Sequence, residues 1–436
     1  MNNKKKAAVY VLGCKVNQAE AEAIAQMFDS AGYEIVDFSQ KANVYVIHTC
    51  TVTKESERKC RQAIRRAVNL NPDAVIAVTG CYAQTSFDDV LSIEGVDVVV
   101  GTSGRSRIVE LVEEAFKKKE TVVAVADISH EGFKSFEELP LYYSKRVRAF
   151  LKIQEGCQEF CTYCIIPYAR GPIRSMPRED VLKRIREMVD RGYKEVVISG
   201  IRLGAYGKDF NPPYSLAELL TEILNKTDVK RLRVSSIDPQ DFTPQLVEVL
   251  TEKRTICPHF HIPLQSGDDY VLKRMGRKYS TEEYARIIER IRAKRPEVSF
   301  TTDVMVGFPG ESEENFLNTL NFIKEMGFMD IHVFKFSPRK GTPAYSFPDQ
   351  VPGNIKKKRS EEVQKLAAEL YRKFASGFLG KTLDVLVEQL KDDLWVGHAP
   401  NYLLVKFPSP KDLQGEIVKV KISGVGDKFV LGEGIF

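Results

Sequence analysis

The N-terminal part of the chain alternates between short apolar runs and amphipathic stretches. Two of these stretches, 17–31 and 55–69, carry apolar residues at helical spacing and predict helices. The apolar, β-rich runs predict strands at 7–13, 44–49, 74–80 and 96–100. Strands that are apolar throughout and alternate with helices indicate a parallel sheet with both faces covered.

The middle of the chain repeats the strand–helix pattern six times. The predicted strands are 148–153, 195–200, 231–236, 259–264, 299–307 and 330–336. The predicted helices are 178–190, 216–225, 244–251, 281–292 and 314–326. Six β/α units predict a second α/β domain, in which chemistry is expected at the carboxyl ends of the strands.

The pattern changes again after a long basic helix predicted at 355–379. Short alternating strands at 383–388, 402–407 and 416–422 indicate a small β-barrel. OB-like barrels often bind oligonucleotides. From Ser376 onward, however, the chain has seven lysines, no arginine and eight acidic residues. The barrel is therefore not basic overall, and it would bind nucleic acid through one part of its surface and not through its net charge.

The composition bears on the number of domains and on the cellular location of the protein. A chain of 436 residues with 43% hydrophobic residues suits two or three globular domains. No apolar run approaches the roughly 20 residues of a membrane span. The apolar run after Met1–Lys6 ends at Gly13 and predicts a first strand and not a signal peptide. We therefore expect a cytoplasmic protein without a membrane partner; a net charge of +5 permits nucleic acid but does not require it.

Three of the eight cysteines stand together directly after a predicted strand. Cys157, Cys161 and Cys164 have the spacing C-x3-C-x2-C. Three thiolates can hold three corners of a [4Fe–4S] cluster and leave one iron free for another ligand. A structural zinc loop is the alternative, but zinc normally takes a fourth protein ligand, and none lies close downstream.

Three further cysteines each follow one of the first three N-terminal strands. Cys14, Cys50 and Cys81 should therefore meet at the carboxyl edge of the predicted sheet. They suit a second cluster with three protein ligands. The alternative is three buried structural cysteines, which would be expected inside strands and not repeatedly at their exits. We interpret Cys60 as a helix-packing residue and Cys257 as a core residue.

These features resemble the radical SAM methylthiotransferase family over nearly the whole chain. The resemblance rests on Gly13–Gln18, Thr49–Thr53 and Gly80–Gln84, on the cysteine loop with Ile165–Gly171, and on Pro263–Gly267 and Asp303–Glu311. It implies an α/β protein with a parallel N-terminal sheet, a partial (β/α)6 barrel and a TRAM-like β-barrel. The expected domains are 4–116, 143–374 and 375–436, with a linker at 117–142.

The resemblance also implies two [4Fe–4S] clusters and S-adenosylmethionine as cofactors. The cluster on Cys157, Cys161 and Cys164 binds S-adenosylmethionine and forms a radical from it. The cluster on Cys14, Cys50 and Cys81 carries or donates sulfur. An electron donor such as flavodoxin or ferredoxin is expected. Since an aromatic C–H is far too weakly acidic for side-chain bases, the cofactor supplies the hard chemistry.

Four further residues are candidate cofactor contacts. Tyr163 precedes the last cysteine of the loop. Ser199 and Gly200 could hold the methionine amino group, and Ser236 could touch the ribose. Ordinary strand-end chemistry explains the two serines and Gly200 equally well. Trp395, the only tryptophan, could stack on a base, although a place in the barrel core is favoured.

The expected substrate is the anticodon arm of tRNA. Cys14–Gln18, Cys50–Thr53 and Gly200–Gly207 are most similar to the branch that acts on N6-threonylcarbamoyladenosine at position 37. His48 departs from that branch, which more often has Asn there. Four basic stretches suit RNA: Arg58–Arg66, Lys145–Arg148, Arg170–Arg178 and Lys356–Arg359. The alternatives are N6-isopentenyladenosine in tRNA, a ribosomal-protein aspartate, or a non-catalytic protein that binds metal and RNA.

Overall fold

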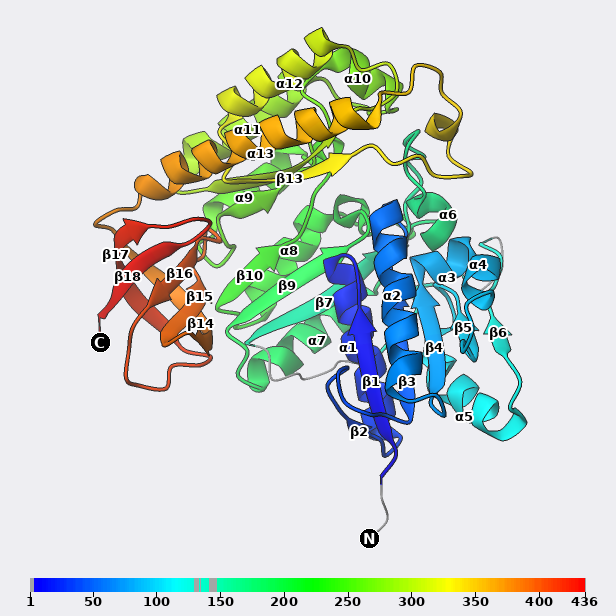
Figure 1. Cartoon of the computed structure of the whole chain (residues 1–436). Helices are drawn as coiled ribbons and strands as arrows, with labels where there is room; N and C mark the ends of the chain where they lie inside the picture. Colours follow the sequence, from blue (N-terminus) through cyan, green and yellow to red (C-terminus); the bar gives the residue numbers. More distant parts are fainter. Residues whose placement is uncertain (1–3, 129–132, 134, 141–146, 436) are drawn as a thin grey trace.

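The computed structural model describes residues 4–128, 133, 135–140 and 147–435 (Figure 1). Three parts follow one another along the chain: an N-terminal sheet domain in blue and cyan, a central domain in green to yellow, and a barrel in orange and red. Within the described residues, every helix is too short or too polar to cross a membrane.

The N-terminal domain is a parallel sheet of strand order β2-β1-β3-β4-β5-β6. Its strands are β1 (Lys6–Val11), β2 (Glu34–Ile35), β3 (Val44–Thr49), β4 (Val75–Gly80), β5 (Val98–Val100) and β6 (Val122–Ala124). Its helices are α1 (Lys15–Ser30), α2 (Lys54–Leu70), α3 (Cys81–Thr85), α4 (Phe87–Leu91) and α5 (Ile108–Lys118). Strand β6 lies within the predicted 117–142 linker and pairs with β5. The boundaries given for the domains and the linker stay predictions.

Both faces of this sheet are covered, as the apolar strands predict. Val44 and Val46 of β3 pack in one cluster with α1 and α5, whereas Tyr45 and Ile47 pack in another with α2. Side chains alternate between the two faces of a strand, so a β-strand that must contact helices on both sides has to be apolar at every position.

The central domain has six parallel strands, as six β/α units predict. They are β7 (Arg148–Glu155), β9 (Glu195–Gly200), β10 (Arg231–Val234), β11 (His259–His261), β12 (Ser299–Val306) and β13 (Asp330–Lys335). Their order is β10-β9-β7 in one sheet and β11-β12-β13 in another. A parallel bridge between Leu232 and Ile256 lies where the sheets approach each other, and β8 (Arg174–Ser175) adds an antiparallel edge to β7. The partial barrel is confirmed.

Helices cover the outside of the central domain. They are α6 (Ile166–Arg170), α7 (Arg178–Asp190), α8 (Leu216–Lys226), α9 (Pro244–Glu252), α10 (Asp269–Arg274), α11 (Thr281–Lys294), α12 (Glu313–Met326) and the long α13 (Gly353–Ser376). Ser215, Ser280 and Ser312 begin α8, α11 and α12 with reciprocal capping boxes. Such caps satisfy free amide groups of the first helical turn, which is why these helices begin at the serines.

The C-terminal strands close into a barrel of order β14-β15-β16-β18-β17. They are β14 (Thr382–Lys391), β15 (Leu394–His398), β16 (Leu404–Phe407), β17 (Ile417–Val425) and β18 (Val430–Ile435). Trp395 is 6% exposed and packs in the barrel core with Phe407 and Val420. Its ring is therefore not a free platform for a nucleobase.

Arginines from the central strands hold the barrel in place. Arg233 donates to the carbonyl oxygen of Pro400 at 3.0 Å and pairs with Glu195 at 2.7 Å. Arg231 donates to the carbonyl oxygen of Asp384 at 2.8 Å, and Arg148 pairs with Glu388 at 3.3 Å. Charge-assisted hydrogen bonds of this kind fix one orientation as well as stabilising it.

This attachment gives a first prediction. We expect Arg233→Leu to lower the free energy of unfolding by about 3 kcal/mol, because Glu195 is then buried without its main partner. Limited proteolysis should then cleave faster between α13 and β14. The exposed Arg254 offers a matched control, and Arg254→Leu should change neither urea unfolding nor cleavage. Equal behaviour of the two variants would contradict a holding role for Arg233.

Candidate functional site

The three N-terminal cysteines lie side by side at the carboxyl edge of the sheet. Cys14 precedes α1, Cys50 follows β3 directly, and Cys81 follows β4 as the first residue of α3. Their strands β1, β3 and β4 are neighbours. Burial, and next the negative charge of Cys81, raises the pKa of Cys50 to about 12. A bound metal takes cysteine side chains as thiolates, so three cysteines at one sheet edge suit a metal centre.

The other three cysteines lie on the loop between β7 and α6. Gly156 opens this loop at φ +78°, and a Cβ there would meet the carbonyl oxygen of Pro172 at 1.7 Å. The Cys157 amide donates to the carbonyl oxygen of Gly171 at 3.0 Å, which folds the loop back onto the end of α6. Burial, and next the charge of Cys161, raises the pKa of Cys164 to about 12. Both sets of thiols suit an iron–sulfur cluster with one iron left open.

The remaining two cysteines are buried elsewhere. Cys60 is fully buried on α2, where its thiol donates to the carbonyl oxygen of Cys50 at 3.7 Å and its neighbours are Ala63 and Ile64. Cys257 is 1% exposed before β11. These positions agree with packing roles for both.

A buried charge network joins the two halves of the site. We define this interface charge network as Glu20, Arg105, Lys152, Glu155 and Arg170. Glu20 pairs with Arg105 at 2.5 Å, with Arg170 at 2.7 Å and with Lys152 at 3.0 Å. Glu155 pairs with the same three cations at 2.9, 2.8 and 2.9 Å. The N-terminal domain contributes Glu20 and Arg105, and the central domain contributes the rest.

The network keeps both carboxylates charged. Burial alone would raise the pKa of the Glu20 carboxyl, but Arg105, Arg170 and Lys152 hold it well below its usual range. Burial would also raise the pKa of Glu155, but Arg105, Lys152 and Arg170 lower it below its usual range. Full pairing is what makes buried charges tolerable at all.

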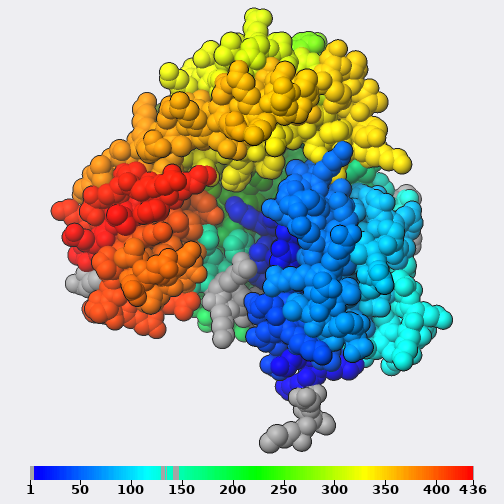
Figure 2. All heavy atoms as spheres, viewed as in Figure 1, coloured from blue at the N-terminus to red at the C-terminus, as the bar shows by residue number. Residues whose placement is uncertain are grey.

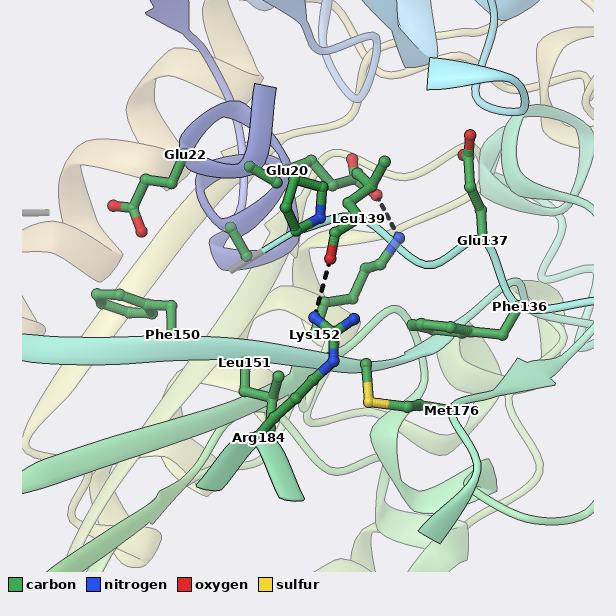
Figure 3. Close-up of a pocket in the computed structure, with 13 residues that line it drawn as sticks. Glu20, Glu22, Phe136, Glu137, Leu139, Phe150, Leu151, Lys152, Met176 and Arg184 are labelled. Carbon is green, nitrogen blue, oxygen red and sulfur yellow. Dashed lines mark hydrogen bonds and ion pairs between the residues drawn. The ribbon is translucent and has the colours of Figure 1, made fainter. Parts of the chain in front are cut away.

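A small cavity lies beside the network (Figure 3). It encloses about 30 Å³ between α1 and β7. Lys152 points toward Glu20 there, and Arg184 donates to the carbonyl oxygen of Leu139 at 2.8 Å. The space suits a water molecule and is far too small for a nucleoside.

Arg170 connects the network to the N-terminal cysteines. Its Nε donates to the Cys81 Sγ at 3.2 Å, and its Nη2 donates to the Asn17 Oδ1 at 2.8 Å. The next residue, Gly171, accepts from the Cys157 amide. The end of α6 therefore contacts one cysteine of each set. On the cysteine loop itself, Arg277 donates to the Cys161 Sγ at 3.4 Å.

Comparison with known proteins agrees with this arrangement. Residues 151–323 match the Radical SAM superfamily, 6–101 match the Uncharacterized protein family UPF0004, and 378–435 match the TRAM domain. The Bacillus subtilis protein named threonylcarbamoyladenosine tRNA methylthiotransferase MtaB is 45% identical over 98% of this chain and 95% of its own length. The chain belongs to the radical SAM methylthiotransferase family.

Other relatives agree on the family. The Aquifex aeolicus protein named threonylcarbamoyladenosine tRNA methylthiotransferase MtaB is 38% identical over 96% of this methylthiotransferase and all of its own length. A Geobacillus thermodenitrificans protein named tRNA-2-methylthio-N(6)-dimethylallyladenosine synthase is 37% identical over 99% and 84%. The structure of the radical S-adenosylmethionine methyltransferase TsrM from Kitasatospora setae, with tryptophan and a SAM analogue bound, superposes with a TM-score of 0.57. It covers 78% of this chain and 75% of its own at 14% identity, which shows the fold alone.

The four candidate cofactor contacts of this methylthiotransferase lie near the cysteine loop or at strand ends. Tyr163 packs edge-on against Phe308, with 6.5 Å between ring centres. The buried Ser199 hydroxyl donates to the carbonyl oxygen of Leu151 at 3.3 Å. At Gly200, a Cβ would meet the Gln154 side chain at 2.8 Å. Ser236 is half-buried after β10. Their roles toward S-adenosylmethionine stay predictions.

Part of the predicted RNA-binding surface is wrong. Arg170 and Arg174 are 0% and 3% exposed, so they cannot meet a phosphate. Their side chains were interpreted as RNA contacts because the carboxylates that neutralise them are not neighbours in sequence.

Two further basic stretches contain an arginine that forms an ion pair within the protein. Arg359 is buried and pairs with Glu311 at 2.6 Å, and Arg148 pairs with Glu388 at 3.3 Å. Lys145 lies outside the described residues. Arg58 is exposed on α2 beside Glu55, so an RNA contact by Arg58–Arg66 stays a prediction.

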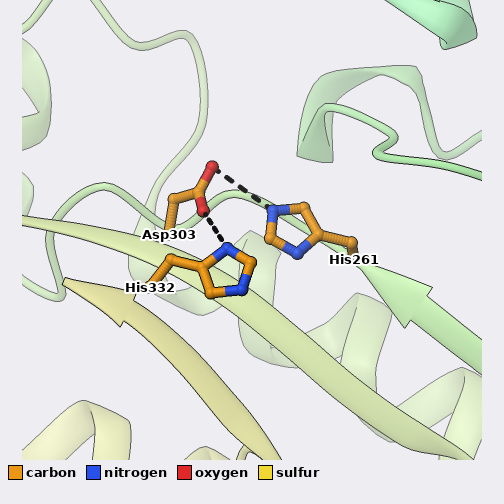
Figure 4. A group of neighbouring side chains, drawn as sticks. All are labelled: His261, Asp303 and His332. Carbon is orange, nitrogen blue, oxygen red and sulfur yellow. Dashed lines mark hydrogen bonds and ion pairs between the residues drawn. The ribbon is translucent and has the colours of Figure 1, made fainter. Parts of the chain in front are cut away.

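A second polar cluster lies on the neighbouring strands β11, β12 and β13 (Figure 4). His261, Asp303 and His332 place one ligand atom each within 4.8 Å of one another. Asp303 bonds to His261 at 3.3 Å and to His332 at 3.2 Å. Burial works to raise the pKa of Asp303, but the two imidazoles hold it below its usual range, and Asp303 raises the pKa of His332. These hydrogen bonds account for the arrangement without an ion.

Both histidines of β11 face the same way. His259 and His261 each bond to the Thr301 hydroxyl, at 3.1 and 3.0 Å. Residues two apart on a strand share a face, which is why both imidazoles reach the same hydroxyl.

The interface charge network gives the second prediction. We expect Glu20→Gln to lower the free energy of unfolding of the apo-protein by about 3–5 kcal/mol at pH 7, since three buried cations lose a shared partner. Because the pKa of Glu20 lies below its unfolded value, its stabilisation is present above about pH 4 and lost as the pH falls further. Denaturant titrations at several pH values should show the gap to wild type closing only below about pH 4.

The exposed Glu34 is the control for this prediction. Among the described residues, the one ion pair of its side chain is a 3.9 Å contact with Lys6, so Glu34→Gln should stay within about 0.5 kcal/mol of wild type. A Glu20→Gln variant that behaves like Glu34→Gln would show that the network stabilises nothing.

Proposed function

We propose that this chain is a tRNA methylthiotransferase that converts N6-threonylcarbamoyladenosine at position 37 to its 2-methylthio derivative. The observation that carries the proposal is the pair of three-cysteine sets, which α6 connects within one site. The substrate follows the relatives: 45% identity to a threonylcarbamoyladenosine enzyme exceeds the 37% to a dimethylallyladenosine enzyme.

Cys157, Cys161 and Cys164 would hold one [4Fe–4S] cluster, and Cys14, Cys50 and Cys81 the other. With S-adenosylmethionine bound, these groups supply a carbon-centred radical and sulfur for a C–H bond that side-chain bases cannot open. The protein positions both sets of cysteines through the contacts made by the end of α6. Ser199, Gly200, Ser236 and Tyr163 are proposed to line the S-adenosylmethionine site, and an electron donor such as flavodoxin or ferredoxin would be required.

The substrate RNA would enter the hollow that opens between the three domains. Figure 2 shows it bounded by the N-terminal domain in blue, the barrel in red and α13 in orange. Where the barrel meets the central strands, three partly exposed side chains suit an anionic and aromatic ligand. These are Arg148, His398 and Tyr402.

Nucleoside analysis tests the substrate. The chain should be expressed in a bacterial strain that lacks its own threonylcarbamoyladenosine methylthiotransferase, and the tRNA digested for mass spectrometry. We expect 2-methylthio-N6-threonylcarbamoyladenosine to return, and a Cys157→Ala chain to leave it absent. Methylthiolation of N6-isopentenyladenosine alone would overturn the substrate, and no methylthiolated nucleoside would favour a non-catalytic protein.

Iron content tests the two sets of ligands separately. The anaerobically reconstituted protein should bind about eight irons per chain. Replacing Cys14, Cys50 and Cys81 together by alanine should leave about four, and so should replacing the loop cysteines. Replacing Cys60 or Cys257 should change nothing, since both pack in cores. Full iron in either triple variant would contradict the assignment.

A further inference from the structure

Lys15, beside the N-terminal cysteines, has no ion-pair partner of its own among the described residues. It follows Cys14 directly and begins α1. Its Nζ lies 5.9 Å from the ring centre of Tyr402, which belongs to the barrel. The ammonium group thus lies between the start of α1 and the barrel. Figure 2 shows dark-blue atoms of the N-terminal segment in the hollow.

The neighbouring cations are all paired. Arg233 pairs with Glu195 at 2.7 Å, and Arg148 pairs with Glu388 at 3.3 Å. In the described part of the chain, Lys15 makes no ion pair with a carboxylate. Around Tyr402, two carboxylates therefore face four cations: Lys15, Arg148, Arg231 and Arg233.

This excess of positive charge points to an anion that the ligand supplies. Glu195, the carboxylate that acts on Lys15, is already paired with Arg233, so an ammonium group beside two arginines is favoured by a further anion. The proposed substrate offers two kinds of anion, the backbone phosphates of the RNA and the carboxylate of the threonyl group.

The position of Lys15 beside Cys14 favours the carboxylate. The methylthio group is added at C2 of the adenine, so C2 must approach the N-terminal cysteines. The threonylcarbamoyl group is attached to N6, the amino nitrogen on C6. Only the ring nitrogen N1 separates C6 from C2. The phosphates lie beyond the ribose, on the other side of the base.

We propose that Lys15 binds the threonyl carboxylate and so selects threonylcarbamoyladenosine over adenosines whose N6 substituent is uncharged. The inference rests on the proposed function and adds a specificity-determining residue to it. A site that provides an ion-pair partner rejects an analogue without the charge, because the buried partner is then left unpaired. Lys15 is a binding residue in this proposal and takes no part in the radical chemistry.

The test compares two RNAs that differ in one charge. Anticodon stem-loops carrying N6-threonylcarbamoyladenosine or its methyl ester bind anaerobically reconstituted protein, and the ratio of the two dissociation constants is measured. We expect wild type to prefer the acid by about tenfold, which a charge-assisted contact supplies. Lys15→Gln should bring the ratio to about one, and Lys15→Arg should keep part of it.

Three controls make the ratio interpretable. Each protein is its own reference, because both RNAs carry the same phosphates. Iron content and the cluster absorption spectrum of Lys15→Gln must equal wild type, since Lys15 adjoins Cys14. Lys118→Gln removes one charge from α5, where Lys118 pairs with Glu114 at 2.6 Å, and should keep the wild-type ratio.

The outcomes distinguish a failure of the Lys15 proposal from a failure of the proposed function. Equal loss of affinity for both RNAs in Lys15→Gln would assign Lys15 to a phosphate and overturn the proposal. An unchanged ratio in Lys15→Gln would overturn it too, while methylthiolation of the acid RNA by wild type leaves the proposed function standing. A wild type that methylthiolates no threonylcarbamoyladenosine overturns both.

Discussion

The structure depends most on the two buried carboxylates that three cations share. Glu20 and Glu155 each contact Arg105, Lys152 and Arg170, so no single pair can be removed without leaving a charge unmatched. Desolvating five charges is costly, and only near-complete pairing offsets that cost. Because the N-terminal and central domains both contribute, the pairing is complete in one relative orientation. Specificity of docking, more than net stability, is what such a network provides.

That orientation determines how the two sets of cysteines face each other. Arg170 reaches Cys81 from α6, and the following residue holds the Cys157 amide. The two contacts come from adjacent residues, so neither set can shift without moving the other. Arg231 and Arg233 of β10 attach the barrel to the same central strands through its backbone carbonyl oxygens. One hydrogen-bonded frame therefore positions both sets of cysteines and the barrel.

The sequence predicted what local patterns determine. Apolar runs gave the strands β3, β9 and β12 closely, and the cysteine positions at strand exits predicted both sets of thiols. Local patterns could not predict pairing over distance: Arg170 meets Glu155 15 positions away and Glu20 150 positions away. A cationic residue whose partner is remote in sequence looks the same as one that meets RNA. The charged Lys152 inside the predicted strand 148–153 was an available signal, since a charge in a buried strand needs a partner.

The division of the interface charge network between two domains also constrains how such chains can evolve. The N-terminal domain carries one of the two carboxylates and one of the three cations, and the central domain carries the complementary share. Exchanging one domain for that of a distant relative would leave unmatched charges at the new junction. Homologous recombination inside the gene should therefore succeed only between parents with the same charge pattern. The two domains should therefore be inherited as one unit, even though each has its own hydrophobic core.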